Sequence, residues 1–133
     1  MSEFKAFLKG NVGDVVNAQL KLERFSEPIS LRPLTPDEGD AITKLCYINK
    51  AGKKGKQERE FDVAKYNREI CLASIVHPDL NNTEIQESYG VMGADSLYSK
   101  LFLLGEANEI LQEIMDISGF NSSIDEEIEK AKN

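Results

Sequence analysis

The chain has 133 residues, of which 41% are apolar and 29% charged, and its formal net charge is −7. This length and mixture are typical of one globular domain that can build its own core without disulfides or metals. The negative charge argues against wholesale binding to nucleic acid or to anionic membranes, and no run approaches the roughly 20 apolar residues that a membrane span needs.

The charges are distributed unevenly along the chain. Acids strongly outnumber bases in residues 106–133, whereas the segment 50–59, called the basic segment below, is rich in lysine. The first residues lack a basic region followed by an apolar run, so we expect no signal peptide and a cytoplasmic protein. Cys46 and Cys71, the only cysteines, each lie within an apolar helical pattern. We expect both to be reduced core residues.

Residues 14–24 alternate between apolar and polar side chains, with Val16, Ala18, Leu20 and Leu22 on one side. This alternation is typical of a half-buried strand, because successive side chains of a strand point to opposite faces. A second alternating run, 29–32, follows after about four residues, so the two runs predict an antiparallel hairpin. Two strands alone are only marginally stable, and we therefore expect helices to cover their apolar face.

The clearest predicted helix start is at Thr35. Thr35 and Glu38 match a capping box, and Pro36 suits the first helical position. An apolar stripe at helical spacing predicts that this helix continues to about Asn49. The following residues, 50–57, have two glycines and no apolar period, which predicts a mobile, exposed loop.

The second half of the chain is predicted to be helical. A helix should begin near Asp62 and end at His77-Pro78, because a residue before proline is disfavoured in a helix. Further helices are predicted at 83–90 with Thr83 and Gln86 as a capping box, at 94–104 before a break at Gly105, at 107–117 before Gly119, and at 124–131. The predicted fold class is therefore α+β, with an N-terminal antiparallel β-hairpin packed against a mainly α-helical body of four to six helices. Residues 1–133 are expected to form a single domain, with 1–12 and 121–133 as candidate mobile ends.

No motif in the sequence predicts catalysis, a cofactor or a metal site. His77 is the single histidine, and neither cysteine lies in a nucleophile motif or in a cluster that could hold zinc. The glycines and lysines of 52–56 lack the spacing of a phosphate-binding loop, and the acids of 125–129 lack that of a calcium loop. Carboxylate acid–base chemistry stays open, but nothing selects one pair of acids. We therefore predict a protein that is not an enzyme and that works by binding other proteins.

One apolar stripe in the C-terminal half is dense for a chain of this size. Its residues are Leu97, Leu101, Leu104, Ile110, Leu111 and Ile114. Core packing is the first interpretation of such a stripe. If part of it is left exposed, it forms an apolar surface for a partner, so these six residues are the candidate binding surface.

The segment Tyr89-Gly90-Val91-Met92-Gly93-Ala94 resembles the XkdN-like phage tail assembly chaperones. The resemblance extends to His77-Pro78-Asp79-Leu80 before it and to Leu103-Leu104-Gly105-Glu106 after it. The opening segment 2–8, the segment 31–34 and the closing segment 119–121 are also similar, so the resemblance spans nearly the whole chain.

The resemblance implies a non-catalytic protein that acts in the host bacterial cytoplasm during tail assembly and is absent from the mature virion. Its partners would be the tape measure protein, which it keeps soluble, and the tail tube protein, whose subunits it recruits; self-association is a further candidate interaction. The alternative is a small regulatory or nucleic-acid-binding protein that uses the basic segment 50–59. Binding of nucleic acid by that segment would weaken steeply with salt.

Overall fold

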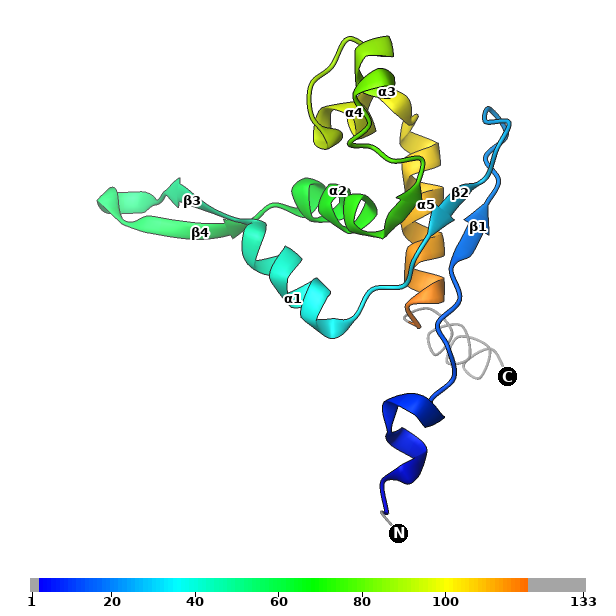
Figure 1. The fold of residues 1–133 in the computed structure, drawn as a ribbon. Helices are drawn as coiled ribbons and strands as arrows, with labels where there is room; N and C mark the ends of the chain where they lie inside the picture. The colour runs from blue at the N-terminus through cyan, green and yellow to red at the C-terminus, as the bar shows by residue number, and fades with distance from the viewer. Residues whose placement is uncertain (1–2, 120–133) are drawn as a thin grey trace, which may run out of the picture.

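The computed structural model of the protein describes residues 3–119 (Figure 1). In chain order its elements are the 3₁₀ turns η1 (Lys5–Phe7) and η2 (Lys9–Asn11), β1 (Ala18–Leu20), β2 (Ile29–Leu31), α1 (Pro36–Leu45), β3 (Tyr47–Ala51), η3 (Lys53–Gly55), β4 (Gln57–Phe61), α2 (Val63–Ser74), β5 (Ile75–His77), α3 (Thr83–Ser88), α4 (Ala94–Leu101) and α5 (Leu104–Ile117). This α+β fold with an N-terminal antiparallel hairpin and a mainly helical body confirms the predicted class. That the whole chain is one domain stays a prediction.

The central sheet has the strand order β1-β2-β5 and is antiparallel throughout. In the predicted hairpin, Ala18 lies opposite Leu31 and Leu20 opposite Ile29. The connection between the strands is longer than the predicted four residues, because the Phe25 amide donates to the Leu22 carbonyl at 3.1 Å and this turn ends β1 early. The third strand, β5, was not predicted; it follows α2 directly and pairs with β2.

Helix α5 stands between α2 and the strands of the hairpin (Figure 1) and contacts both α2 and β1. The buried core gathers Leu22, Ile29, Leu31, Ile42, Cys46, Ile70, Cys71, Leu80, Leu97, Leu101, Phe102, Ile110 and Ile114. Both cysteines are free and buried, as predicted. Burial raises the pKa of the Cys46 thiol and of the Cys71 thiol, so both stay protonated at neutral pH.

Helix α1 begins with the predicted capping box. The Thr35 hydroxyl accepts from the Glu38 amide at 3.4 Å, and the Glu38 carboxylate accepts from the Thr35 amide at 3.2 Å. The prediction was wrong about the end of this helix, which stops at Leu45 rather than Asn49. The predicted loop 50–57 is shorter than expected, since residues 50, 51 and 57 belong to the strands of a second hairpin, β3 and β4, and residues 52–56, which include η3, connect these strands.

This second hairpin extends away from the helices (Figure 1). Its strands pair from Tyr47 opposite Phe61 to Ala51 opposite Gln57. At its base the ring of Phe61 lies 5.2 Å from that of Tyr47 and 5.3 Å from that of Tyr66 in α2. These aromatic contacts favour the pairing of β3 with β4. The sequence analysis did not predict the hairpin, because most residues between the rings are polar.

Two helix boundaries in the C-terminal half differ from the predicted ones. Helix α3 is capped by Asn82, whose side chain accepts from the Ile85 amide at 3.0 Å, rather than by Thr83. The break between α4 and α5 falls at Phe102 and Leu103 rather than at Gly105. Phe102 is buried there, and the Glu106 carboxylate accepts from the Leu103 amide at 2.8 Å, which starts the new helix.

The other predictions for this half have mixed outcomes. Gly119, with φ of 89°, follows the end of α5 as predicted. His77 lies in β5 rather than at a helix end, and its Nε2 is 3.1 Å from a Glu27 carboxylate oxygen. The predicted helix at 124–131 lies outside the described residues.

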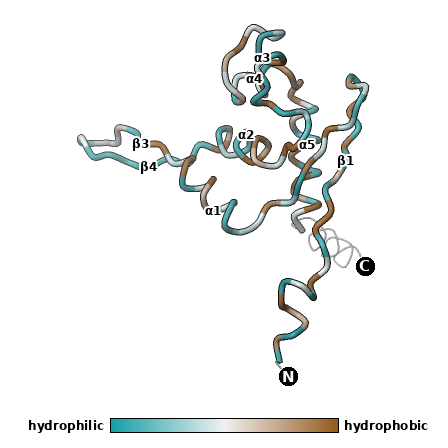
Figure 2. Tube along the Cα trace, viewed as in Figure 1, coloured by the Kyte–Doolittle hydropathy of each residue, from teal (hydrophilic) through white to brown (hydrophobic). Residues whose placement is uncertain are grey.

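Residues 3–17, called the N-terminal arm below, lead away from the body (Figure 1), and each of them is exposed. Figure 2 shows apolar stretches along this arm as well as in the core strands. Whether residues 1–12 are mobile stays a prediction. None of the helices in residues 3–119 is long and apolar enough to cross a membrane.

Candidate partner-binding surface

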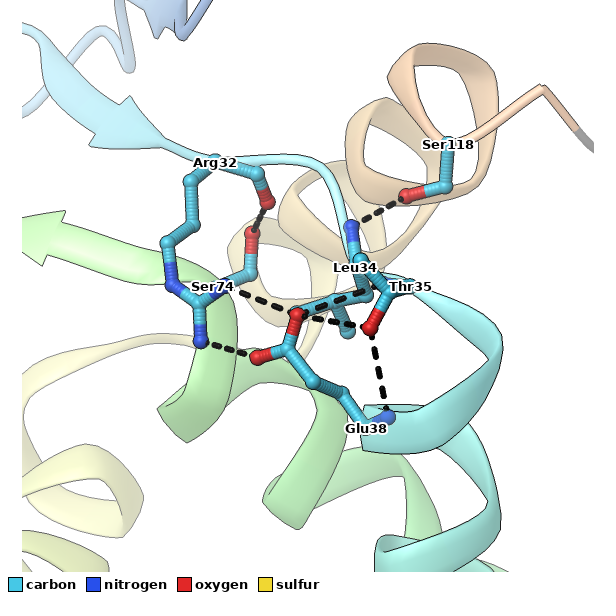
Figure 3. A network of polar contacts seen from close by, with 6 residues as sticks. All are labelled: Arg32, Leu34, Thr35, Glu38, Ser74 and Ser118. Carbon is cyan, nitrogen blue, oxygen red and sulfur yellow. Dashed lines mark hydrogen bonds and ion pairs between the residues drawn. The ribbon is translucent and has the colours of Figure 1, made fainter. Parts of the chain in front are cut away.

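A polar network joins the end of β2 and the segment after it to three helices (Figure 3). The Arg32 guanidinium donates two hydrogen bonds to the Glu38 carboxylate, one of them at 3.0 Å, and so joins the end of β2 to α1. The Ser74 hydroxyl donates to the Arg32 carbonyl at 2.6 Å, and the Leu34 amide donates to the Ser118 hydroxyl at 3.1 Å. The network therefore ties α1, α2 and α5 to one end of the sheet.

The same ion pair changes the acidity of Glu38. Hydrogen bonds from Arg32 and from the Thr35 backbone lower the pKa of Glu38 from 4.5 to about 2. The carboxylate is therefore charged at neutral and mildly acidic pH, where its hydrogen bonds with Arg32 keep β2 joined to α1.

The six residues of the predicted binding surface are not all exposed. Leu97, Leu101, Ile110 and Ile114 are buried in the core, as the first interpretation of the stripe predicted. Leu111 is partly buried, and Leu104 is 81% exposed. Of the six residues, only Leu104 and Leu111 can therefore contact a partner without a change in the core.

Leu104 and Leu111 come together in a groove of about 220 Å³ between three helices. Its lining residues are Ala64, Asn67, Arg68 and Cys71 of α2, Tyr98 and Ser99 of α4, and Leu104, Ala107, Asn108 and Leu111 of α5. A neighbouring hollow shares Arg68 and Ser99 with it, so the depression continues past Arg68 along α4. We call the first of these depressions the α2–α4–α5 groove.

Two of the lining residues, Tyr98 and Arg68, bring polar groups to the groove. Burial raises the pKa of Tyr98, and a hydrogen bond with Tyr98 partly offsets the increase that burial causes in the pKa of Cys71. The Nε of Arg68 is buried and has no hydrogen-bond partner among the described residues. The groove thus offers apolar contact on the α5 side and an unused donor on the α2 side.

The sequence analysis missed the contribution of α2. Ala64, Asn67, Arg68 and Cys71 are spaced by three or four residues and so share one face of the helix. That face carries no large apolar side chain, so the periodicity of large apolar residues did not reveal it. Ala64 and Cys71, the two small side chains at the ends of this face, are the signal that could have indicated a groove.

The basic segment lies in the second hairpin, where part of its charge is already engaged. Lys50 pairs with Glu60 at 3.2 Å, and the Arg59 guanidinium lies 4.6 Å from the centre of the Tyr47 ring. Every side chain of β3 is exposed. The hairpin therefore carries an exposed, mixed-charge surface rather than a continuous basic groove with stacking platforms.

Within residues 3–119 no three or more His, Cys, Asp and Glu side chains gather in a way that could hold a metal ion.

Comparison with known proteins identifies the sequence family. The profile of the phage XkdN-like tail assembly chaperone proteins matches residues 4–132. The XkdN protein of the phage-like element PBSX of Bacillus subtilis (strain 168) is 23% identical over 107 residues, which are 80% of this chain and 72% of that protein. The crystal structure of the protein YqbN is similar in fold, with a TM-score of 0.70 and 19% identity over 90% of this chain and 98% of that one.

Proposed function

The chain belongs to the XkdN-like family of phage tail assembly chaperones, and on that premise we propose that it binds the tape measure protein and recruits tail tube subunits during tail assembly. It does so in the host cytoplasm, without catalysis, and leaves before the virion is complete. The main support for this proposal is the match to the family over residues 4–132. The α2–α4–α5 groove supplies the surface on which we build it.

The groove suits an apolar ridge of a partner helix. Leu104 lies almost fully in solvent at the start of α5, and Leu111 lies two turns further along the same helix. A helix whose side chains recur every three or four residues can contact both leucines at once. A tape measure protein, as a long helical chain that would aggregate before a tube covers it, presents ridges of this kind.

Charge around the groove supports solubility of the complex. Glu109 is exposed and Glu113 partly exposed on α5, and the whole chain carries a net charge of −7. Several chaperone copies bound along a tape measure protein would therefore repel one another and keep the complex in solution. The unused Nε–H of Arg68 would donate a hydrogen bond to a carboxylate or carbonyl oxygen of the partner.

The test is co-expression of the chain with the tape measure protein of the same phage or phage-like element. We expect the tape measure protein to be insoluble alone and to co-purify with this chain as a soluble complex. A tape measure protein that is soluble alone and does not co-purify would contradict the proposed function.

A pair of leucine variants then tests the groove. Leu104→Gln removes apolar contact from the groove and should weaken binding about tenfold or more, because a buried leucine contributes roughly 1.5–3 kcal/mol. Leu45→Gln is the matched control, since Leu45 is 59% exposed at the end of α1 and does not line the groove. Equal binding by the two folded variants would exclude the groove and leave the chaperone function standing.

A further inference from the structure

An apolar pocket lies at the end of α5, between α1, α2 and the last turn of α5 and beside the polar network of Figure 3. It has a volume of about 360 Å³ and shares no lining residue with the α2–α4–α5 groove. A cavity of about 150 Å³ between apolar side chains already holds benzene, so this pocket has room for an aromatic ring and more. Its apolar lining comes from Leu34, Pro36, Tyr66, Ile70, Ile114 and Met115.

The backbone at the end of α5 directs the chain toward this pocket. Gly119 has a φ of 89°, and its amide donates to the Asp116 carbonyl at 3.1 Å. A left-handed glycine with this bond is typical of a Schellman motif, in which the residue after the glycine packs against the third or fourth residue from the end of the helix. Those residues are Met115 and Ile114, and both line the pocket. The residue after the glycine is Phe120, so the motif predicts an aromatic ring at the pocket.

The sequence that follows Phe120 has a further apolar stripe. Residues 120–133 lie outside the described residues, and the sequence analysis predicts a helix at 124–131. In such a helix Ile124, Ile128 and Ala131 share one face, because they are spaced by four and three residues. Glu126 and Glu129 fall on the opposite face. The predicted helix therefore has one apolar face and one acidic face.

The face of α1 at the pocket suits the close approach of this predicted helix. Pro36, Gly39 and Thr43 line the pocket and are spaced by three and four residues, so they share one face of α1. A Cβ added to Gly39 would meet no atom within 4 Å, so the space beside this residue is open. Residues 120–123 span at most about 14 Å when extended, which keeps the predicted helix close to the end of α5.

We infer that residues 120–131 dock in the α1–α2–α5 pocket of their own chain. Phe120 enters the pocket beside Met115, and Ile124 and Ile128 cover the exposed face of α1. A segment that is attached at the edge of the pocket is present there at a high effective concentration, which favours docking within one chain over docking between copies. The docked segment removes the apolar lining from water and leaves its acidic face in solvent.

A single introduced tryptophan tests this contact, because the chain has no tryptophan of its own. The experiment compares the full chain with Phe120→Trp and the full chain with Phe7→Trp, the matched control in the N-terminal arm, where Phe7 is 77% exposed. Emission wavelength and quenching by acrylamide are measured over a range of protein concentrations. We expect the tryptophan at position 120 to emit at shorter wavelength and to be quenched several-fold less than the one at position 7, at every concentration.

Further substitutions in the Phe120→Trp chain test whether the pocket causes this protection. Met115→Glu places a charge in the apolar lining and should return the emission to that of the exposed control. Leu45→Glu is the matched control and should change nothing, since Leu45 is 59% exposed and does not line the pocket. Gly39→Leu, which occupies the open space beside α1 and leaves α5 intact, is the second pocket variant in case Met115→Glu unfolds the chain.

Thermal unfolding measures how much the docked ring stabilises the fold. Phe120→Ser should lower the Tm by about 5 °C or more, because it removes a buried phenylalanine ring from a small domain. Phe7→Ser removes an exposed ring and should change the Tm by about 2 °C or less.

Any of four results would overturn the inference. Equal emission and quenching at positions 120 and 7 would place Phe120 in solvent. Protection that grows with protein concentration would place the segment on a second copy. Protection that survives the pocket variants in folded chains would place the ring elsewhere, and equal Tm values for Phe120→Ser and Phe7→Ser would mean that the ring is not buried. None of these results bears on binding of the tape measure protein through the separate groove.

Discussion

The two β-hairpins of this protein share one pairing pattern and differ in their surroundings. In β1–β2 the apolar side chains enter the core, where Leu31 is 0% and Ile29 is 1% exposed, and β5 adds a third strand. In β3–β4 every side chain of β3 is exposed, and contact with the body is concentrated in the rings at the base. The comparison shows that alternation of apolar and polar residues indicates a strand with one buried face. Two strands can also pair when neither face is buried, and the sequence then shows no alternation.

The largest expected difference between the hairpins lies in their apolar residues. Leu31→Ala should lower the free energy of unfolding by about 2–5 kcal/mol, because it leaves a cavity in the core. Ile48→Ala, at a side chain of β3 that is 42% exposed, should lower it by about 0.5 kcal/mol or less. Urea unfolding of both variants measures the difference, and equal losses would mean that the second hairpin is packed as tightly as the first.

The next difference concerns acid stability. Because the pKa of Glu38 is lowered to about 2, the Arg32–Glu38 link adds stability that is complete above pH 4.5 and is lost as the pH falls through 2. Glu38→Gln should cost about 1 kcal/mol at pH 7, since the pair is partly exposed.

The loss caused by Glu38→Gln should shrink between pH 4.5 and pH 2, as followed by urea unfolding at each pH. The control is Glu60→Gln, which removes the carboxylate that pairs with Lys50 in the second hairpin. It should change stability by a few tenths of a kcal/mol. A loss for Glu38→Gln that does not depend on pH would contradict the assignment.

A smaller effect is expected from removal of most of the second hairpin. Tyr47 and Phe61 lie directly opposite each other, so an Asn-Gly turn can replace residues 48–60 while the aromatic contacts at the base remain. We expect the body to stay folded and to lose about 1 kcal/mol or less, because an isolated hairpin contributes little.

The same replacement tests the alternative function. It removes the basic segment, so any salt-dependent retention of the chain on nucleic acid should disappear with it. Retention that survives the replacement would exclude the basic segment as its cause. A body that unfolds without residues 48–60 would show instead that the hairpin is part of the core structure.

The smallest expected effect belongs to the contact between Arg59 and the Tyr47 ring. Arg59→Ala should cost about 0.5–1 kcal/mol, the usual contribution of an exposed cation–π contact. Arg59→Lys should keep part of it, because lysine retains the charge and loses the planar stacking. Thermal unfolding compares the stability of the two variants. A larger loss of stability in Arg59→Lys than in Arg59→Ala would contradict a stabilising cation–π contact.

The sequence predicted those elements whose signals are local. The capping box at Thr35 and the alternation through Leu20 and Leu22 depend on neighbouring residues alone, and both indicated real elements. Strand β5 was missed because it follows α2 without a break and its Val76 is exposed, which leaves no alternation to detect. Its strand conformation comes from pairing with β2, which is distant in sequence.

The candidate surface was predicted only in part for a related reason. The six apolar residues were taken as one stripe on helices with a break at Gly105, but the chain turns at Phe102 instead. Leu104 therefore starts a new helix and points into solvent, whereas Leu97 and Leu101 before the turn are buried. The elements that pack against a helix decide which of its faces is buried. A single sequence does not show which elements these are.

The burial of both cysteines makes the protein convenient for chemical labelling. Reagents that modify thiols attack the thiolate, and burial raises the pKa of Cys46 and of Cys71 and shields both sulfurs. A cysteine introduced at exposed Asn11 would therefore react far faster than the native pair. A fluorophore attached there would report the surroundings of the arm in a folded chain that keeps both of its own cysteines.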